Sequence, residues 1–307
     1  MSGYMGKILR VNLTEKTVEV EPLDIKVAQK FLGSRGLGVK IMMDEVPANV
    51  EPLSQENKLI IATGALTGAP VPTSGRYMVI SKSPLTGTIA IANSGGYWGP
   101  KFKATGHDAI IFEGKADKPV YLYIEDDKIE IRDASHIWGK TVSEATEIIK
   151  EDHDGANVLS IGPAGEKLSL MASIMNDLDR AAGRGGIGAV MGSKNLKAVV
   201  VKGSKKVSLF DEEKVKKVSS EKIKILREDP VAGGGLPSYG SAVLVNIINE
   251  SGVLPVRNFQ KSYTDNADLI SGETMTEKHL VKKQACFRCP IACGRVVKLA
   301  DGTVVGG

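Results

Sequence analysis

The 307-residue chain contains only three cysteines, and all of them lie between residues 286 and 293. A disulfide framework would spread an even number of cysteines along the chain, so this grouping indicates reduced thiols and a metal site. No run of residues approaches the roughly 18 consecutive apolar positions of a membrane helix, and the amino terminus lacks the apolar region of a signal peptide. We therefore expect a cytoplasmic protein that has no membrane partner.

The chain also lacks a large excess of charge of either sign. The formal net charge is +4, from 40 basic and 36 acidic residues that are scattered along the chain without a block of like charge. Only 5% of the residues are aromatic. Because binding to a phosphate backbone usually needs a clustered basic face, this distribution disfavours nucleic acid as a partner.

What is present is an ordinary globular composition, with 42% hydrophobic and 25% charged residues. At roughly 100 to 200 residues for each domain, the length suggests two domains. We place the boundary near residue 207, between an α+β domain of residues 1–207 and the beginning of a helical domain of residues 208–307. No internal repeat is apparent.

The first domain opens with two alternating segments, 7–13 and 16–21, that predict a β-hairpin. A short amphipathic helix follows, with Ile25, Ala28, Phe31 and Leu32 on its apolar side and Gly33 at its end. Further short segments with strand patterns favour a largely antiparallel or mixed sheet. These segments are 59–62, 76–80, 88–92, 109–112, 120–124, 158–161 and 196–201.

Four further helices are predicted. The capping box formed by Thr141 and Glu144 opens a helix that directs Val142, Ala145, Ile148 and Ile149 inward. After residue 207, helical spacing of apolar residues predicts three more. They cover residues 211–229, the region around 242–250, and residues 273–283.

Cys286, Cys289 and Cys293 have the spacing C-x2-C-x3-C, which lets three thiolates converge from a tight turn and the first turn of a following helix. An iron–sulfur cubane suits such a loop, although it normally takes four cysteines. Structural zinc would need a further ligand, and the nearest histidine, His279, lies in a predicted helix. The order is opposite to the C-x3-C-x2-C of radical enzymes that use S-adenosylmethionine. Three buried thiols grouped without a metal are the alternative.

The segment Gly183-Arg-Gly-Gly-Ile-Gly188 matches the dinucleotide pattern G-x-G-x-x-G, but a strand begins by Leu196 and leaves no room for a crossover helix. Its backbone N–H groups, with Arg180 and Arg184 beside them, could instead bind an anion such as phosphate. The segments 72–77 and 91–97 are similar loops at strand ends. In each case a structural turn is the alternative.

Together these segments resemble the aldehyde ferredoxin oxidoreductase family along essentially the whole chain. The resemblance rests on motifs that occur in the family's order. They lie at residues 6–13, 31–38, 62–68, 73–77, 82–87, 92–97, 132–139, 180–186, 191–197 and 286–293. It implies a fold in which a β-rich first domain of two sheets forms a base under paired pterins and mainly helical domains follow.

The resemblance also implies cofactors: one tungsten, or molybdenum, held by two pterins, beside a [4Fe-4S] cluster. Cys286, Cys289 and Cys293 would then be three of the four cluster ligands, and Arg76 would lie between cluster and pterin. Asn93 and the backbone carbonyl of Ala181 would bind a Mg²⁺ ion that bridges the two pterin phosphates. The remaining phosphate and pterin contacts would come from Gly95, Arg180, Gly183 and Arg184.

The implied activity is oxidation of an aldehyde to a carboxylate, with electrons passing through the cluster to ferredoxin. Family members continue for a comparable length beyond the cysteine motif, and the full-length proteins are expected to be homo-oligomers. We therefore expect the fourth cluster ligand and the groups nearest the metal to lie in a C-terminal half or separate subunit. A non-catalytic cofactor-binding module and an independent electron-transfer protein are the alternatives. The four histidines are scattered, and none is a convincing acid or base.

Overall fold

A computed structural model describes residues 2–306 of the chain. The chain divides into two compact units, of which the first comprises Met1–Pro70 and Ser74–Glu212. The second comprises Glu213–Gly307 together with the short segment Val71–Thr73. This division lies a few residues after the boundary predicted at residue 207, and the grouping of Val71–Thr73 with the second unit was not predicted.

The first sheet of unit 1 has six strands in the order β2-β1-β6-β3-β4-β5. The predicted hairpin is confirmed, because β1 and β2 pair in antiparallel register. Strands β1 and β6 are parallel, and the remaining neighbours are antiparallel, so the sheet is mixed. The strands are β1 (Lys7–Asn12), β2 (Thr17–Pro22), β3 (Leu59–Thr63), β4 (Tyr77–Lys82), β5 (Ile89–Ser94) and β6 (Ala109–Glu113).

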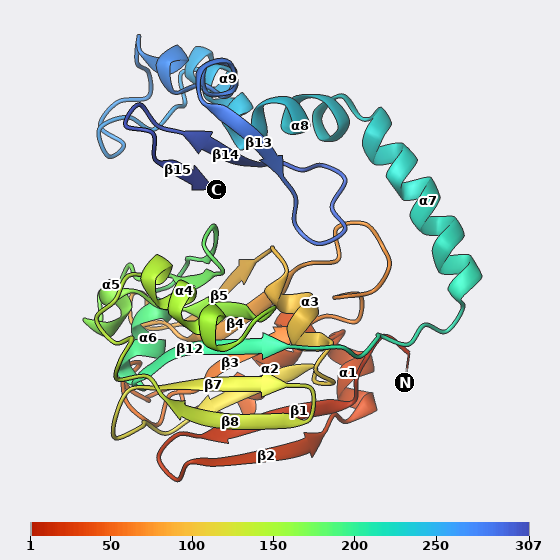
Figure 1. The fold of residues 1–307 in the computed structure, drawn as a ribbon, viewed down its shortest axis with the longest axis vertical. Coiled ribbons are helices and arrows are strands. Elements are labelled where there is room, and N and C mark those ends of the chain that lie inside the picture. The colour runs from red at the N-terminus through yellow and green to blue at the C-terminus, as the bar shows by residue number, and fades with distance from the viewer. Residues whose placement is uncertain (1, 307) are drawn as a thin grey trace. The chain divides into compact units, whose positions relative to one another are not determined.

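The second sheet also has six strands, in the order β11-β10-β9-β12-β7-β8, and only β7 and β12 are parallel. Two mixed sheets with helices around them confirm the predicted α+β class, as Figure 1 shows. The strands are β7 (Val120–Glu125), β8 (Lys128–Asp133), β9 (Asn157–Ser160), β10 (Ile174–Asn176), β11 (Arg180–Ala182) and β12 (Leu196–Lys202).

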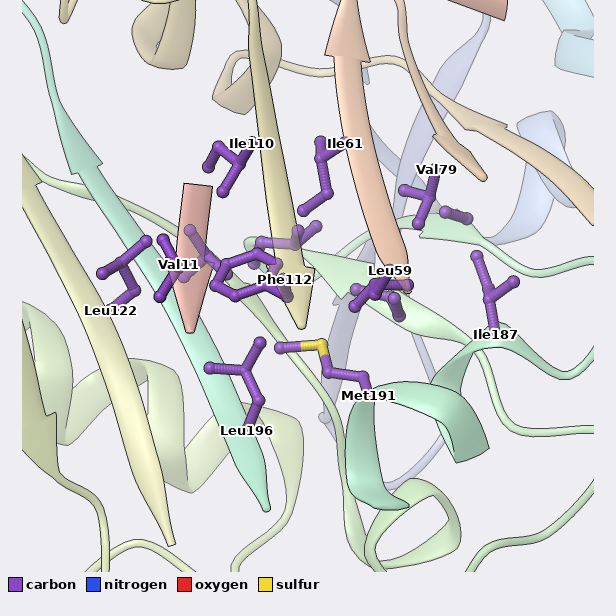
Figure 2. Close-up of a cluster of buried hydrophobic side chains, with 14 of the residues drawn as sticks. Val11, Leu59, Ile61, Val79, Ile110, Phe112, Leu122, Ile187, Met191 and Leu196 are labelled. Atoms are coloured by element: carbon purple, nitrogen blue, oxygen red, sulfur yellow. The ribbon is translucent and has the colours of Figure 1, made fainter. Parts of the chain in front are cut away.

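The main core lies between the two sheets and follows from the alternation of side chains along each strand. Leu9 and Val11 of β1 enter the same buried cluster as Leu122 of β7, whereas Ile8 and Tyr121 face other clusters. Figure 2 shows this inter-sheet cluster around Phe112. It also holds side chains from α3 (Trp98–Lys103) and α6 (Ile187–Ser193).

Helices cover the outer faces of the two sheets. Helices α1 (Ile25–Phe31) and α2 (Ser34–Glu45) pack on the first sheet, and α4 (Val142–Asp152) packs on the second. The capping box of α4 is confirmed, with Thr141 accepting from the Glu144 backbone N–H. The inward position predicted for Leu32 is wrong, since α1 ends at Phe31 and Leu32 is a 73% exposed cap residue with a left-handed φ of 56°. Helix α5 covers Pro163–Glu166.

The helix predicted for residues 211–229 is α7 (Glu212–Glu228), which belongs to unit 2 from Glu213 onward. The predicted helix 273–283 is wrong in its second half, because α10 ends at Lys278 and Leu280–Gln284 is strand β13. Pairing with β14 supplies the hydrogen bonds that helix continuation would have supplied. The remaining elements are η1 (Pro230–Gly235), α8 (Leu236–Tyr239), η2 (Gly240–Val243), α9 (Leu244–Glu250), η3 (Ala267–Ile270), α10 (Gly272–Lys278), β14 (Gly294–Lys298) and β15 (Val304–Gly306).

Consecutive helical turns over Pro230–Glu250 are, by length and composition alone, apolar enough to cross a membrane, with a mean hydropathy of 1.3. This is weak evidence, because helices of soluble proteins pass the same test. The stretch is also irregular, since it combines π, α and 3₁₀ turns and has a φ of 67° at Gly240. The absence of a membrane partner stays a prediction.

Candidate functional site

The site in unit 1 is built where the two sheets meet at their edges. Strand β5 is the last strand of the first sheet, β11 is the last strand of the second, and the two lie against each other. Strand β5 carries Asn93 and leads into Gly95, while β11 carries Arg180 and Ala181. Four of the predicted site residues, far apart in sequence, are therefore brought to one place by the packing of the sheets.

One buried side chain joins these two edges. The Asn176 amide nitrogen, on β10 opposite Arg180, donates to the Gly95 carbonyl oxygen at 2.6 Å. Gly96 follows with a φ of +79°, and a Cβ there would lie 2.9 Å from that amide nitrogen. Glycine at position 96 thus permits the close approach that the hydrogen bond requires. Asn176 was not predicted, because nothing in its local pattern distinguishes it from other polar strand residues.

Arg76 and Asn93 are also brought together. Arg76 immediately precedes β4, and its Nη1 donates to the Asn93 side-chain oxygen at 2.5 Å. Both side chains are exposed. The guanidinium therefore has further N–H donors directed to the surface, and the amide oxygen retains a second lone pair. A phosphate and a cation are chemically suited to these two groups.

The glycine-rich turn of residues 183–188 packs against β5 from the other side. Gly185 and Gly186 have φ of +70° and +68°, and a Cβ on Gly185 would lie 2.5 Å from Ala90 of β5. The Ser83 hydroxyl donates to the Gly185 carbonyl at 2.8 Å and holds the turn in place. Part of this motif is therefore a structural turn, which was the alternative to an anion-binding loop.

Gly183 and Arg184 differ from the rest of the turn. Both are exposed, and a Cβ on Gly183 would meet its nearest neighbours at ordinary contact distances of 3.8 and 3.9 Å. Packing within unit 1 therefore does not explain glycine at position 183, whereas approach of a ligand to the backbone would.

The dinucleotide interpretation is excluded, because β11 and β12 run antiparallel with β10 and β9 between them.

Three buried polar groups lie behind this surface. The hydroxyls of Tyr77 and Ser94 and the Asn176 side-chain oxygen are buried without a well-formed hydrogen bond within residues 2–306. Burial raises the pKa of Tyr77, even though Ser94 and Asn176 lie close enough to lower it. Of these groups, the Asn176 amide holds the Gly95 loop through its hydrogen bond to the Gly95 carbonyl.

The cysteine motif lies in unit 2, in the loop between β13 and β14. The prediction that a helix follows the motif is wrong, because Gly294–Lys298 is a strand of a three-stranded sheet. The Cys289 N–H donates to the Cys286 carbonyl at 3.0 Å, and Arg288 and Ala292 both have a φ of +49°. Each of these two residues lies in the left-handed region of backbone conformation and makes a tight turn in the loop.

All three cysteines are free, with Cys286 and Cys289 half-buried and Cys293 exposed. Among residues 2–306, no group of three His, Cys, Asp or Glu side chains is arranged to hold a metal ion. The donor chemistry nevertheless fits an iron–sulfur cluster, since thiolates are its usual ligands and the loop presents three within eight residues. Their assignment as metal ligands stays a prediction.

The Thr73 N–H donates to the Arg288 carbonyl of the cysteine loop at 3.0 Å. This contact explains why the segment Val71–Thr73 belongs to unit 2. Arg76 follows Thr73 by three residues in the sequence and belongs to unit 1.

Comparison with known proteins decides the family. The family model described as the aldehyde ferredoxin oxidoreductase N-terminal domain matches residues 8–203, and the model of domains 2 and 3 of the same proteins matches residues 217–306. The chain belongs to the aldehyde ferredoxin oxidoreductase family. It is thereby placed in an enzyme family of oxidoreductases.

Curated relatives of this family agree. The chain is 58% identical to the tungsten-containing aldehyde ferredoxin oxidoreductase of Pyrococcus abyssi over 96% of its own length and 49% of the relative's. For the Pyrococcus furiosus protein of the same name, the identity is 57% over 97% of the chain and 50% of the relative. The chain spans about half the length of the curated relatives it matches.

A solved structure has a similar fold. The active-site complex BamBC of benzoyl coenzyme A reductase, bound to 1,5-dienoyl-CoA, superimposes with a TM-score of 0.86 and 36% sequence identity. The match covers 100% of this chain and 49% of that one. The fold of the described residues is thus that of known family members.

Proposed function

We propose that this chain is the cofactor-binding half of an oxidoreductase that converts an aldehyde and water into a carboxylate at a tungsten bis-pterin centre. The overall change releases two electrons and three protons, and a [4Fe-4S] cluster held by Cys286, Cys289 and Cys293 would pass the electrons to ferredoxin. The observation that carries the proposal is the meeting of β5 and β11, which gathers Asn93, Gly95, Arg180 and Ala181 beside exposed Arg76.

The residues of unit 1 would hold the phosphates of the pterins. Arg76, Arg180 and Arg184 supply guanidinium groups, and the exposed backbone at Gly183 can approach an anion without a side chain between them. Asn93 and the Ala181 carbonyl lie on the two adjoining strands and offer oxygen ligands for Mg²⁺. When bound, the metal and pterins supply the oxygen-transfer chemistry, and the protein's part is binding and orientation.

The residues of unit 2 would hold the cluster through Cys286, Cys289 and Cys293. Within unit 2, the Thr73 N–H donates to the Arg288 carbonyl of this loop. By the family resemblance, Arg76 of unit 1 would contact both cofactors and assist electron transfer between them.

The most informative test is elemental analysis of anaerobically purified protein for W, Mo, Fe and Mg. We expect tungsten or molybdenum together with iron and magnesium, and pterin fluorescence after release of the cofactor. Protein that binds iron alone, without pterin, would contradict the proposal and favour an independent electron-transfer protein.

A second candidate is a module that works only with a separate C-terminal chain; the chain itself covers about half of each relative. The test is aldehyde-dependent reduction of a viologen by the metal-loaded chain, alone and after addition of a polypeptide that corresponds to the relatives' remaining half. Activity only in the presence of the second polypeptide supports this candidate. Activity of the 307-residue chain alone excludes it.

A further inference from the structure

Arg295 is a buried arginine beside the cysteine loop, and no role was predicted for it. It lies on β14, two residues after Cys293, and is only 5% exposed. Its Nη1 donates to the carbonyl oxygens of Ala292 at 3.1 Å and Gly294 at 3.0 Å. Its Nη2 donates to those of Leu236 at 2.8 Å and Pro237 at 2.9 Å. The guanidinium thus ties the end of the cysteine motif to α8.

The charge of Arg295 has no acidic partner among the described residues, since all four of its acceptors are neutral carbonyls. Its Nε is buried and has no hydrogen-bond partner within residues 2–306. A buried charge without a counter-charge is strongly unfavourable. Burial lowers the pKa of Arg295 and the neighbouring Cys293 opposes this effect, but a guanidinium stays protonated in proteins.

Other buried cations of this protein show why Arg295 is different. Lys103 and Lys197 are completely buried, and each has a carboxylate partner, Asp108 and Glu166 respectively. Lys194 donates only to carbonyl oxygens, and burial lowers its pKa to about 8, so it can lose its proton. Arg295 has neither a carboxylate nor the ability to become neutral.

The Arg295 side chain and Cys293 share a neighbour and a pocket. Gly240 has a φ of +67°, and a Cβ there would lie 2.9 Å from the Cys293 carbonyl oxygen and 3.3 Å from Arg295 Nε. Cys293, Arg295 and Gly240 also line one pocket of about 360 Å³ in unit 2, together with Met275 and Val297. An anionic group held by Cys293 would therefore lie close to a fixed positive charge.

We propose that Arg295 is the counter-charge and positioning residue for the thiolate-bound cluster of Cys286, Cys289 and Cys293. It holds the backbone on either side of Cys293 and favours the more negative, reduced state of the cluster. This inference rests on the proposed function, since it assumes the cluster. On reduction the cluster accepts one electron from the added reductant, no bond forms or breaks, and its net charge becomes one unit more negative. A nearby positive charge stabilises that state.

The test uses the 307-residue chain, reconstituted anaerobically with ferrous iron and sulfide, with 2-mercaptoethanol present as a source of a fourth thiolate. Wild type is compared with Arg295→Gln, Arg295→Lys and the control Lys298→Gln, which removes one charge from an exposed position of the same strand. Iron content and circular dichroism are measured first. The reduction potential of the cluster is then measured by titration followed by electron paramagnetic resonance.

We expect the cluster of Arg295→Gln to be about tenfold harder to reduce, which is about 59 mV for one electron. Arg295→Lys keeps the charge and should stay within about threefold of wild type, and Lys298→Gln within about twofold. If the equilibrium constant for reducing the cluster of Arg295→Gln lies within twofold of the wild-type value, the inference is overturned.

Two further outcomes are separable. If Arg295→Gln does not fold, the comparison of Arg295→Lys with wild type decides, and a tenfold shift there overturns the charge role. If wild type takes up no iron, the cluster part of the proposed function fails and the inference fails with it. The iron content distinguishes this result from a failure of the inference alone, in which wild type holds a cluster that ignores Arg295.

Discussion

Asn176 donates its side-chain amide to the carbonyl of Gly95 at 2.6 Å, across 81 positions of sequence. This hydrogen bond joins β10 of the second sheet to the loop that leaves β5 of the first. Arg180 lies opposite Asn176 in the β10–β11 hairpin, and Asn93 lies two residues before Gly95. One buried amide therefore sets the spacing between the two strands that carry the candidate phosphate and Mg²⁺ contacts.

We expect Asn176→Ala to destabilise unit 1 by about 1–3 kcal/mol, because the buried Gly95 carbonyl loses its donor. Cofactor content should fall as well, since the Gly95 loop is no longer held against β10. Asn157→Ala is a matched control, because its amide bonds the Asp177 carboxylate, which is 20% exposed and can turn to water. Urea denaturation of both variants checks the prediction, and equal losses of stability would contradict it.

The glycine-rich turn offers a pair of substitutions that separates folding from ligand binding. Gly186→Ala should destabilise the fold by about 2–4 kcal/mol, because φ is +68° and the new Cβ would lie 2.5 Å from the Leu170 carbonyl oxygen. Gly183→Ala should fold as well as wild type, within about 1 kcal/mol.

The cofactor measurement for this pair is pterin and tungsten content at equal protein concentration. We expect Gly183→Ala to lose cofactor although its denaturation curve is unchanged, because the methyl group would intrude where the phosphate approaches. A folded Gly183→Ala variant with full cofactor content would show that position 183 is only a turn.

Arg76→Ala should change the free energy of unfolding by less than about 0.5 kcal/mol, because the side chain is exposed. If Arg76 contacts the cofactors, tungsten and pterin content should nevertheless fall several-fold, and Arg76→Lys should recover only part of it, since lysine cannot donate as a planar fork. Lys118→Ala, which removes another exposed cation of unit 1, is the control. Equal metal content in all variants would argue against a role for Arg76.

His107 should make unit 1 sensitive to acid. Burial, with Lys7 and Lys205 nearby, lowers the pKa of His107 from 6.5 to about 4. The unfolded chain therefore binds a proton near pH 6.5 that the folded chain accepts only near pH 4, so stability falls as the pH drops through this window. Through His107, the free energy of unfolding should fall by on the order of 3 kcal/mol across this pH window.

The variant His107→Gln should flatten the stability profile between pH 6.5 and 4, which thermal unfolding across this range would measure. His136→Gln, at an exposed histidine, should leave the profile unchanged. Parallel profiles for wild type and His107→Gln would mean that the proton is taken up equally in both states.

Local patterns predicted most of the elements correctly. The alternation in residues 7–13 and 16–21 gave the β1–β2 hairpin, and Thr141 and Glu144 gave the start of α4, because hairpins and caps depend on residues close in sequence. The errors were Leu32 at the end of α1, the second half of the helix predicted for residues 273–283, and the helix predicted after the cysteine motif, where β14 stands. Helix α10 stops at Lys278 since β13 pairs with β14, a partner that periodicity within residues 273–283 does not reveal.

By itself the sequence determined the three-cysteine spacing, the glycine-rich turn, the two-domain composition and the resemblance to a family, all of which are properties of short segments or their order. Only the tertiary structure decided that β5 meets β11, that Asn176 holds Gly95 and that Arg295 is buried without an acidic partner among the described residues. These relationships join residues far apart in the chain. They arise from sheet packing and desolvation, which depend on the whole fold and leave no periodic signal in any single segment.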